Sequence, residues 1–290
     1  MNSPFRYAGG KFYARKLILE CILSNYTYYA EPFAGGASIF FGKSKVENNW
    51  LNDADEELVN CLITIRDEPE RLIDGLNGEK ALKERHNYFK NEFQAHTNLD
   101  RAIRWFYLNR TSYSGIMNMQ NCYWGYGEKY SMRPENWPKN IRRASQKLQN
   151  VIITSFDFER VIREVPDNAF LFIDPPYFNA DQGKFYTHTF SLSDHLRLCE
   201  ALRNNSHRLN FLLTYDDSPE IRELYAWSNE ITAKEWNYTI NRTDDQKNGT
   251  KEKGTRYKGK EIFIMNYNNT TRYNLQINLI NQEIMDLNTA

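Results

Sequence analysis

A carboxylate followed directly by two prolines and an aromatic ring is the stretch of this chain best suited to chemistry. It reads Phe170-Leu171-Phe172-Ile173-Asp174-Pro175-Pro176-Tyr177. Four apolar residues without a polar break indicate a strand buried on both faces, and proline ends a strand because it cannot donate to the sheet. We therefore expect Asp174 at the carboxyl end of a buried strand, where open α/β sheets bind ligands. A plain strand and turn is the alternative, which the other motifs must decide.

A glycine pair earlier in the chain predicts a second part of the same site. An aromatic run leads into Glu31-Pro32-Phe33-Ala34-Gly35-Gly36-Ala37-Ser38, and a helical apolar pattern follows. A strand, a glycine turn and a helix in this order open nucleotide-type sites in doubly wound sheets. The loop does not match G-x-G-x-x-G, so a dinucleotide is a poor fit. The pattern favours a ligand with an adenosine-like part.

Acidic residues follow two further predicted strands. Asp53 comes directly after a strand at 49–52, roughly 20 residues beyond the glycine loop, where such folds place an acid on ribose hydroxyls. Asp55 is equally suited to capping the next helix, and capping remains an alternative for both residues. Asp157 and Phe158 end a β-branched strand at 151–158, which predicts a third strand end in contact with the ligand.

The start of the chain offers a further ligand contact. Gly9 and Gly10 precede Lys11 and a helix predicted at 12–24. Two adjacent glycines let the backbone approach a ligand closely or turn tightly into the helix. A disordered start that leads into a surface helix is the alternative.

These residues suit the transfer of a group from an activated donor. They include no Ser/His/Asp set, no metal-ligand cluster and no Walker lysine in context, so no metal is required. The exocyclic amine of adenine is a poor nucleophile because its lone pair is delocalised into the ring. Asp174 and the Pro175 carbonyl are placed to accept hydrogen bonds from its two N–H groups, which directs the nitrogen lone pair at an electrophile. Tyr177 is placed to stack on the base. A base in a duplex must first be flipped out, at a cost of about a few kcal/mol. A sulfonium methyl donor needs no metal, and positioning supplies most of the rate.

The chain divides by pattern into an α/β part and a helical insert. At 290 residues it can hold one large domain or two smaller ones. The α/β pattern covers 1–55 and 150–270, the helical insert covers 56–149, and a tail without chemical signal covers 271–290. Helices are expected in the insert at 58–66, 79–93, 100–108 and 140–148. Outside it, a helix is expected at 194–203 and strands at 210–215 and 261–267.

Two polar segments are candidates for contact with nucleic acid. Residues 109–127 form a long, aromatic, glycine-punctuated stretch, and long loops of this kind are usually functional or disordered. Its side chains suited to base-edge and backbone recognition are Arg110, Asn118, Gln120, Asn121 and Tyr123. Residues 238–260 are rich in lysine, and the side chains expected near phosphate are Lys251, Lys253 and Arg256. A solvated loop and a solvated hairpin are the respective alternatives.

Composition is that of a soluble globular protein, with 41% hydrophobic and 26% charged residues. Lys and Arg number 37, as do Asp and Glu, so the net charge is zero, which weighs mildly against a nucleic-acid partner. A local basic patch can still bind phosphate. We find no run of membrane-spanning length and no signal peptide, and the four scattered cysteines indicate a reducing cytoplasm.

Taken together, the motifs resemble those of the Dam-like (D12 class, α-group) DNA adenine-N6 methyltransferases. The similarity covers residues 5–267, and while each motif alone is weak, their order is specific. The motifs that carry it are Ala8-Gly9-Gly10-Lys11, Glu31-Pro32-Phe33-Ala34-Gly35-Gly36, Asp53, Asp157-Phe158, Asp174-Pro175-Pro176-Tyr177 and Lys260-Glu261-Ile262.

The resemblance implies a class I S-adenosylmethionine-dependent methyltransferase fold, an α/β Rossmann-like and mostly parallel sheet, with a helical target-recognition insert at 56–149. It implies contacts to S-adenosylmethionine from Tyr7, Lys11, Phe33, Ala34, Gly35, Gly36, Ser38, Asp53, Asp157, Phe158 and Asp174. It implies catalysis on double-stranded DNA by Asp174, Pro175, Pro176 and Tyr177. Arg6 matches a position that contacts DNA in relatives, where lysine is usual. A cytoplasmic enzyme of bacterial or phage origin is implied, and a cognate restriction endonuclease is left open.

The insert departs from the pattern of relatives that methylate GATC. Those relatives carry an arginine after an Asn-Gly-Leu-like turn, whereas this chain has Asn118 after Ser114-Gly115-Ile116-Met117. Loss of a bidentate guanine contact typically removes about 1–3 kcal/mol of discrimination, which puts GATC in doubt as the target. The sequence does not indicate the target, the processivity or the oligomeric state.

Three other functions compete with this one. A methyltransferase that acts on RNA or on a protein amide uses similar chemistry at an Asx-Pro-Pro-Tyr motif. A non-catalytic DNA-binding relative is disfavoured because every motif residue is present. A nicotinamide oxidoreductase is disfavoured because the glycine loop does not match G-x-G-x-x-G.

Overall fold

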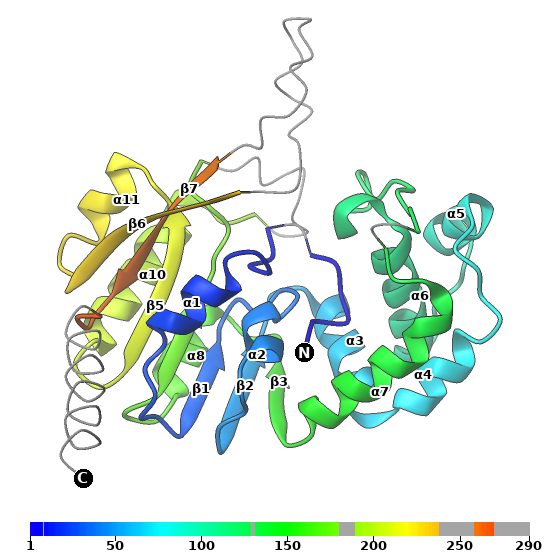
Figure 1. The fold of residues 1–290 in the computed structure, drawn as a ribbon, viewed down its shortest axis with the longest axis horizontal. Helices are drawn as coiled ribbons and strands as arrows, with labels where there is room; N and C mark the ends of the chain where they lie inside the picture. Colours follow the sequence, from blue (N-terminus) through cyan, green and yellow to red (C-terminus); the bar gives the residue numbers. More distant parts are fainter. Residues whose placement is uncertain (8, 129–130, 180–188, 238–257, 270–290) are drawn as a thin grey trace, which may run out of the picture.

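A seven-stranded sheet forms the centre of the protein. The computed structural model describes residues 1–7, 9–128, 131–179, 189–237 and 258–269. The strand order is β3-β2-β1-β4-β5-β7-β6, in which β1 to β5 pair in parallel and β7 pairs antiparallel with β5 and β6 (Figure 1). The strands are β1 Tyr28–Glu31, β2 Asn48–Asn52, β3 Val151–Thr154, β4 Phe170–Ile173, β5 Asn210–Asp216, β6 Glu230–Asn237 and β7 Lys258–Met265. The expected α/β, mostly parallel sheet is confirmed.

The middle of the sheet fixes where a ligand binds. All four residues of β4 are buried, as the unbroken apolar run predicts, and β4 pairs with β1 on one side and β5 on the other. Strand order reverses between β1 and β4, since β1 continues to β2 and β3 while β4 continues to β5. At such a reversal the connections leave in opposite directions, and a crevice opens outside the carboxyl ends of the strands.

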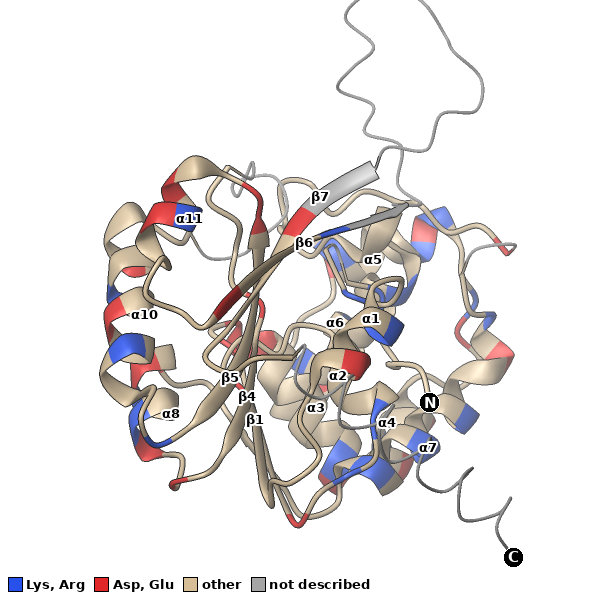
Figure 2. Cartoon of the chain, turned by 60° about the vertical axis from the view of Figure 1, so that its left-hand side comes forward, with Lys and Arg blue, Asp and Glu red and all other residues tan. Residues whose placement is uncertain are grey.

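Helices cover both faces of the sheet and produce two apolar layers. Seen nearly edge-on in Figure 2, α8, α10 and α11 lie on one side of the sheet and α1, α2 and α3 lie on the other. Side chains alternate across β4: Phe170 and Phe172 pack in one buried cluster, Leu171 and Ile173 in the other. The bounds are α1 Arg15–Cys21, α2 Ser38–Gly42, α3 Glu56–Asp67, α8 Phe158–Glu164, α10 Leu192–Asn205 and α11 Pro219–Leu224.

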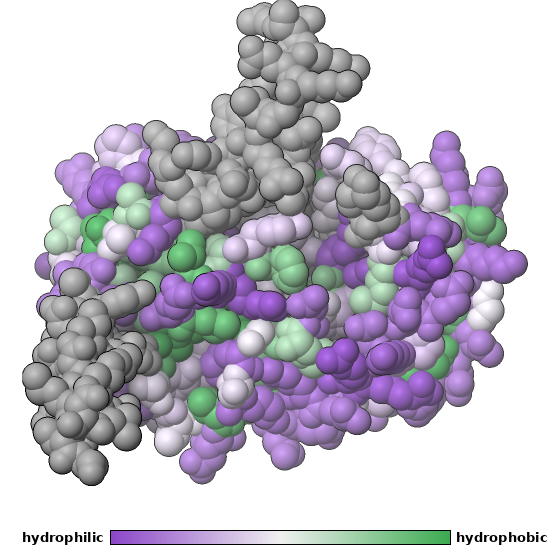
Figure 3. All heavy atoms as spheres, viewed as in Figure 1, coloured by the Kyte–Doolittle hydropathy of each residue, from purple (hydrophilic) through white to green (hydrophobic). Residues whose placement is uncertain are grey.

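Helices α3 to α7 occupy the chain between β2 and β3, the helical insert predicted at 56–149. Its remaining helices are α4 Pro69–Gly75, α5 Lys83–Asn91, α6 Asn98–Thr111 and α7 Trp137–Leu148. Figure 1 shows them beside β3, and the face shown in Figure 3 is mostly hydrophilic over this region. Trp137 is buried against the rings of Phe106 and Tyr107. This core is continuous with the layer that contains Phe170, so the insert packs on the sheet rather than apart from it.

Several helices begin at side-chain caps. Asp55 accepts hydrogen bonds from the backbone N–H groups of Glu57 and Leu58, so the capping alternative for Asp55 is confirmed. Asp157 likewise accepts from Glu159 N and begins α8. The strand expected at 151–158 is therefore too long: β3 ends at Thr154, because the capping interaction commits Asp157 to the helix.

Asn52 links the ends of three strands. The side chain is 1% exposed, and its Nδ2 donates to Pro32 O (3.0 Å) and Phe156 O (2.9 Å). Its Oδ1 accepts from Phe156 N and Thr154 Oγ1, each at 2.7 Å. One amide at the end of β2 thus satisfies polar groups at the ends of β1 and β3, where sheet hydrogen bonding stops.

Some sequence predictions fall outside the described residues. These are the basic side chains Lys251, Lys253 and Arg256 and the tail at 271–290. Within the described ranges, no helix is long and apolar enough to cross a membrane, and no three His, Cys, Asp or Glu residues group as metal ligands.

We expect Asn52→Leu to lower the free energy of unfolding by on the order of 3 kcal/mol, because it leaves several buried polar groups without a hydrogen-bond partner. Thr154→Val removes the hydroxyl that bonds Asn52 and Trp50, and should cost about 1 kcal/mol. Urea denaturation followed by circular dichroism measures both. Equal losses in the two variants would show that Asn52 does not hold the strand ends together.

Candidate active site

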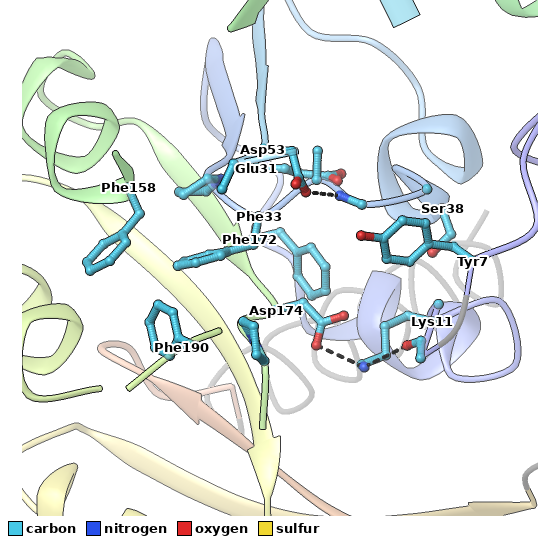
Figure 4. A pocket seen from close by; sticks show the side chains of 18 of the residues that line it. Tyr7, Lys11, Glu31, Phe33, Ser38, Asp53, Phe158, Phe172, Asp174 and Phe190 are labelled. Carbon is cyan, nitrogen blue, oxygen red and sulfur yellow. Dashed lines mark hydrogen bonds and ion pairs between the residues drawn. The ribbon is translucent and has the colours of Figure 1, made fainter. Parts of the chain in front are cut away.

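A cavity of about 290 Å³ lies outside the carboxyl ends of β1 and β4. Figure 4 shows Phe33, Phe158 and Phe190 at one end and Tyr7, Lys11 and Asp174 toward the other. The structure brings every residue predicted to contact the methyl donor into its wall, together with Pro176 of the predicted catalytic motif. The lining includes Tyr7, Lys11, Phe33, Ala34, Gly35, Gly36, Ser38, Asp53, Asp157, Phe158, Asp174 and Pro176.

The glycine loop is shaped by close contact with Tyr7. Gly35 has φ +47°, and a Cβ there would lie 2.8 Å from the Tyr7 ring. A Cβ on Gly36 would lie 2.9 Å from Tyr7 Cβ. Gly35 therefore requires glycine both for backbone conformation and for space, and Gly36 requires it for space.

Asp53 holds this loop in place. Its Oδ2 accepts a hydrogen bond from Gly35 N at 2.7 Å, and its Oδ1 accepts from Asp55 N at 3.0 Å. The predicted position at the strand end is correct. The role predicted for it, a contact with ribose hydroxyls, remains a prediction.

Glu31 is a buried carboxylate below the loop that the sequence did not mark as a site residue. Its Oε1 accepts from Tyr29 Oη (2.8 Å) and Phe40 N (2.7 Å), and it lines the cavity. Burial raises the pKa of Glu31 to about 7, which the hydrogen bonds from Tyr29 and Phe40 oppose. Glu31 thus connects β1 to the first turn of α2, because its carboxylate accepts the N–H of Phe40.

The three rings at the opposite end form an apolar cluster. The ring of Phe33 is stacked on Phe158 at 5.3 Å and meets Phe190 edge-on at 5.6 Å. Arg197 lies over the Phe158 ring at 4.9 Å and forms ion pairs with Asp157, Glu159 and Asp194. Arg197 thereby fixes Asp157 and α8 beside the cavity. No local pattern in the sequence could have indicated this role.

Asp174 is held by two residues from elsewhere in the chain. Lys11 Nζ lies 2.8 Å from Asp174 Oδ1, and Thr214 Oγ1 donates to the same oxygen at 2.7 Å. Among the described residues, none donates a hydrogen bond to Oδ2. Asp174 is 19% exposed, against 5% for Lys11, so the carboxylate reaches the cavity while its partner is enclosed.

A second carboxylate lies behind this pair. Glu261 on β7 is 2% exposed, with Oε2 3.8 Å from Lys11 Nζ. Burial raises the pKa of Glu261 to about 7, while the charge of Lys11 lowers it and that of Asp174 raises it. Lys11 Nζ also lies 4.8 Å from the centroid of the Tyr177 ring. One enclosed ammonium therefore contacts both carboxylates and the aromatic ring of the Asp-Pro-Pro-Tyr motif.

The turn after the motif is fixed by β5. Asp216 accepts hydrogen bonds from Phe178 N (2.9 Å) and Asn179 Nδ2 (2.8 Å). The Tyr177 ring lies 6.1 Å from the ring of Tyr215. The stiffness predicted from two prolines is thus reinforced by an acid that the sequence did not single out.

The residues predicted to contact DNA have different positions. Gln120 and Tyr123 are exposed, the latter by 61%, and Asn118 and Asn121 are half-buried. Arg110 does not belong to the loop: α6 continues to Thr111 and buries Arg110, whose Nη1 donates to Pro4 O at 3.2 Å. The helix extends further than expected because this last turn packs on the N-terminal segment.

Arg6 lies between the insert and the cavity. Its Nη1 donates to Ser112 O (3.1 Å) and Ser131 Oγ (3.0 Å). The loop itself is closed by backbone hydrogen bonds, from Tyr113 N to Tyr123 O and from Gly125 N to Thr111 O. These hydrogen bonds join the two ends of the loop.

The chain belongs to the D12 class of N6 adenine-specific DNA methyltransferases, whose family model matches residues 7–240. It is similar to the type II methyltransferase M1.LlaDCHI of Lactococcus lactis subsp. cremoris, with 28% identity over 92% of this chain and 96% of that protein. It is also similar to the type II methyltransferase M.CviBI of Paramecium bursaria Chlorella virus NC1A, with 27% identity over 78% of this chain and 86% of that protein.

A third relative is the DNA adenine methylase of Haemophilus influenzae, with 22% identity over 77% of this chain and 83% of that protein. The family predicted from the motifs is thus confirmed, and the sheet order is consistent with the class I methyltransferase fold. The family transfers a methyl group to adenine in DNA, so a methyl donor is implied.

We expect the free energy of unfolding to fall as the pH rises from about 4.5 to about 7, because folded Glu31 and Glu261 keep protons that the unfolded chain releases. Each group contributes a slope of at most about 1.4 kcal/mol per pH unit. Glu31→Gln should remove its share of the slope, measured by urea denaturation from pH 4.5 to 8. Glu47→Gln, which changes an exposed carboxylate, should leave the slope intact. An unchanged slope in Glu31→Gln would contradict the assignment.

Proposed function

We propose that this cavity binds S-adenosylmethionine and that the Asp-Pro-Pro-Tyr motif directs the N6 amine of a flipped adenine in double-stranded DNA at the donor's methyl group. The observation that carries the proposal is the arrangement of Asp174. Its Oδ1 is engaged by Lys11 and Thr214, and no described residue donates a hydrogen bond to Oδ2, on the carboxylate that lines the cavity.

The residues around the cavity fit this donor. Phe33 and Phe158 offer flat apolar faces for an adenine ring, and Gly35 and Gly36 let the backbone come close. Asp53 lines the cavity beside Gly35, whose N–H its Oδ2 accepts, and a carboxylate at this strand end suits contact with ribose hydroxyls. When bound, S-adenosylmethionine supplies a methyl group on a positively charged sulfur.

In this proposal Asp174 and the Pro175 carbonyl accept hydrogen bonds from the two N6–H groups of the target adenine. That reduces delocalisation of the nitrogen lone pair into the ring and aims it at the methyl carbon. The N6–carbon bond forms as the carbon–sulfur bond breaks with its electron pair going to sulfur, and N6 releases one proton to water. Pro176 and Tyr177 complete the pocket, with the Tyr177 ring against the base. Because Lys11 and Thr214 hold the carboxylate in advance, little reorganisation is needed.

The helical insert at 56–149 is proposed as the DNA target-recognition domain, and 1–55 with 150–270 as the catalytic domain. The exposed side chains of Gln120 and Tyr123, the half-buried Asn118 and Asn121, and the guanidinium of Arg6 support this. We also propose a cytoplasmic enzyme of bacterial or phage origin that works with a cognate restriction endonuclease. Support comes from the relatives named type II methyltransferases, two of which come from a bacterium and a virus.

We expect Asp174→Ala to reduce kcat by about a hundredfold or more, since it removes a preorganised acceptor of the reacting amine. Donor affinity, measured by calorimetry with S-adenosylhomocysteine, should change far less than kcat. Asp167→Ala changes a carboxylate with 76% exposure and should retain full activity. Turnover by Asp174→Ala at the parent rate would remove the motif from the mechanism.

The proposed activity is tested by treating plasmid from a methylation-free host with purified protein and S-adenosylmethionine. Sequencing that reports modified bases should find N6-methyladenine in one short recurring context, which also tests whether the site differs from GATC. A protein that binds the donor and modifies no adenine in this DNA would overturn the proposal and favour an RNA or protein substrate.

A further inference from the structure

One buried side chain of the helical insert forms hydrogen bonds with the backbone of the N-terminal segment, residues 1–7. Asn109 in α6 is fully buried and accepts a hydrogen bond from Arg6 N at 3.0 Å. Its Nδ2 donates to Arg6 O at 2.7 Å. A single amide thus satisfies both backbone groups of one residue, as a neighbouring strand would. The two residues are 103 positions apart, so this contact joins separate parts of the fold.

Neighbouring contacts hold the same segment from other directions. The Phe5 ring packs edge-on against Trp105 at 4.7 Å, and Arg110 Nη1 donates to Pro4 O. Gly115 has φ +72°, and a Cβ there would lie 2.3 Å from Arg6 O. The segment therefore has no room to move toward the insert, and its hydrogen bonds oppose movement away from it.

The next residue along the chain is a wall of the cavity. Tyr7 lies against Gly35 and Gly36, and its carbonyl accepts a hydrogen bond from Gly10 N at 3.1 Å. Figure 4 shows the Tyr7 ring beside Ser38, facing the side of the cavity where Lys11 meets Asp174. Arg6 and Tyr7 are adjacent in the chain. A fixed Arg6 backbone therefore restricts the position of the Tyr7 Cα, from which the ring extends.

We propose that Asn109 and Gly115 are positioning residues for the donor pocket: they act through the Arg6 backbone to hold Tyr7 against the glycine loop. Neither is among the described residues that line the cavity. The inference rests on the proposed function, since it concerns affinity for the proposed donor. Its consequence is that the insert, proposed to recognise DNA, also sets how tightly the donor binds.

Two glycine variants test this with a matched control. Gly115→Ala adds a methyl group that clashes with the Arg6 carbonyl oxygen and so displaces the Arg6 backbone. We expect affinity for S-adenosylhomocysteine to fall about tenfold, which corresponds to about 1.4 kcal/mol. Gly78→Ala is the control, because Gly78 has a similar φ of +77° with no described neighbour within 4 Å of the added carbon. Its affinity should match that of the parent. Equal affinities in all three proteins, or equal losses in both variants, would overturn the inference.

Two asparagine variants test the hydrogen bonds themselves. Asn109→Leu keeps the volume and removes both contacts with Arg6, and should weaken binding by a similar factor. Asn49→Leu is the control: Asn49 is also buried and donates to a backbone carbonyl, that of Val46 at 2.8 Å, but it does not line the cavity. We expect both variants to lose thermal stability and only Asn109→Leu to lose donor affinity. Equal donor affinity in the two would overturn the inference.

A double-mutant cycle shows whether the effect passes through Tyr7. In a Tyr7→Ala background, Asn109→Leu should cause no further loss of affinity, because the ring it positions is gone. Fully additive losses would overturn the inference. The proposed function fails separately: a parent protein that bound no S-adenosylhomocysteine would contradict the donor assignment, and the inference with it. A parent that bound it while Asn109→Leu and Gly115→Ala bound equally well would contradict the inference alone.

Discussion

The contact between Lys11 and Asp174 is the interaction on which the site depends. It joins the N-terminal segment to the end of β4 at 2.8 Å, and it closes one side of the cavity. An ammonium with 5% exposure would be costly without a partner, since isolated buried charges are strongly unfavourable. The same contact orients the carboxylate so that one oxygen is engaged and the other is not. Enclosure of the lysine and orientation of the acid are therefore one requirement.

Two more carboxylates lie close by, and both carry a cost. Glu31 and Glu261 are almost fully buried, and burial raises the pKa of each to about 7. Glu31 is compensated by hydrogen bonds from Tyr29 and Phe40, and Glu261 by the charge of Lys11. Negative charge in this region would favour binding of the cationic methyl donor proposed for the cavity. The stability lost at neutral pH is the counterpart of that electrostatic environment.

In the function proposed above, the insert recognises the target and the strand ends of the sheet serve the transfer chemistry. The loop at 112–127 contains Asn118, at the position where the resemblance implied an arginine in relatives that methylate GATC. Asn118 is itself used locally, since its Oδ1 accepts from Gln120 N at 3.0 Å. The insert also contacts the N-terminal segment through Asn109 and shares a continuous core with the sheet. The insert and the cavity are thus parts of one packed structure.

The sequence by itself determined where β2 and β4 end and where the glycine loop lies. The apolar run before Asp174 predicted β4, the glycine pair predicted the loop, and Asp53 was placed at its strand end, because each signal lies within a few adjacent residues. Helices were predicted less well: α4 was missed, and α6 extends through Arg110, which the sequence placed in a loop. Helix ends depend on packing and on caps, as at Asp157, and local patterns do not fix them.

Only the tertiary structure decided which distant residues support the site. Asn52 bonds groups 102 to 104 residues away, Asn109 bonds Arg6 across 103, and Arg197 joins three acids around Phe158. No pattern of neighbouring residues indicates which distant groups these side chains bond. Their roles arise because folding leaves specific backbone and side-chain groups buried without partners, and the residue that can satisfy them is known only once the chain is packed.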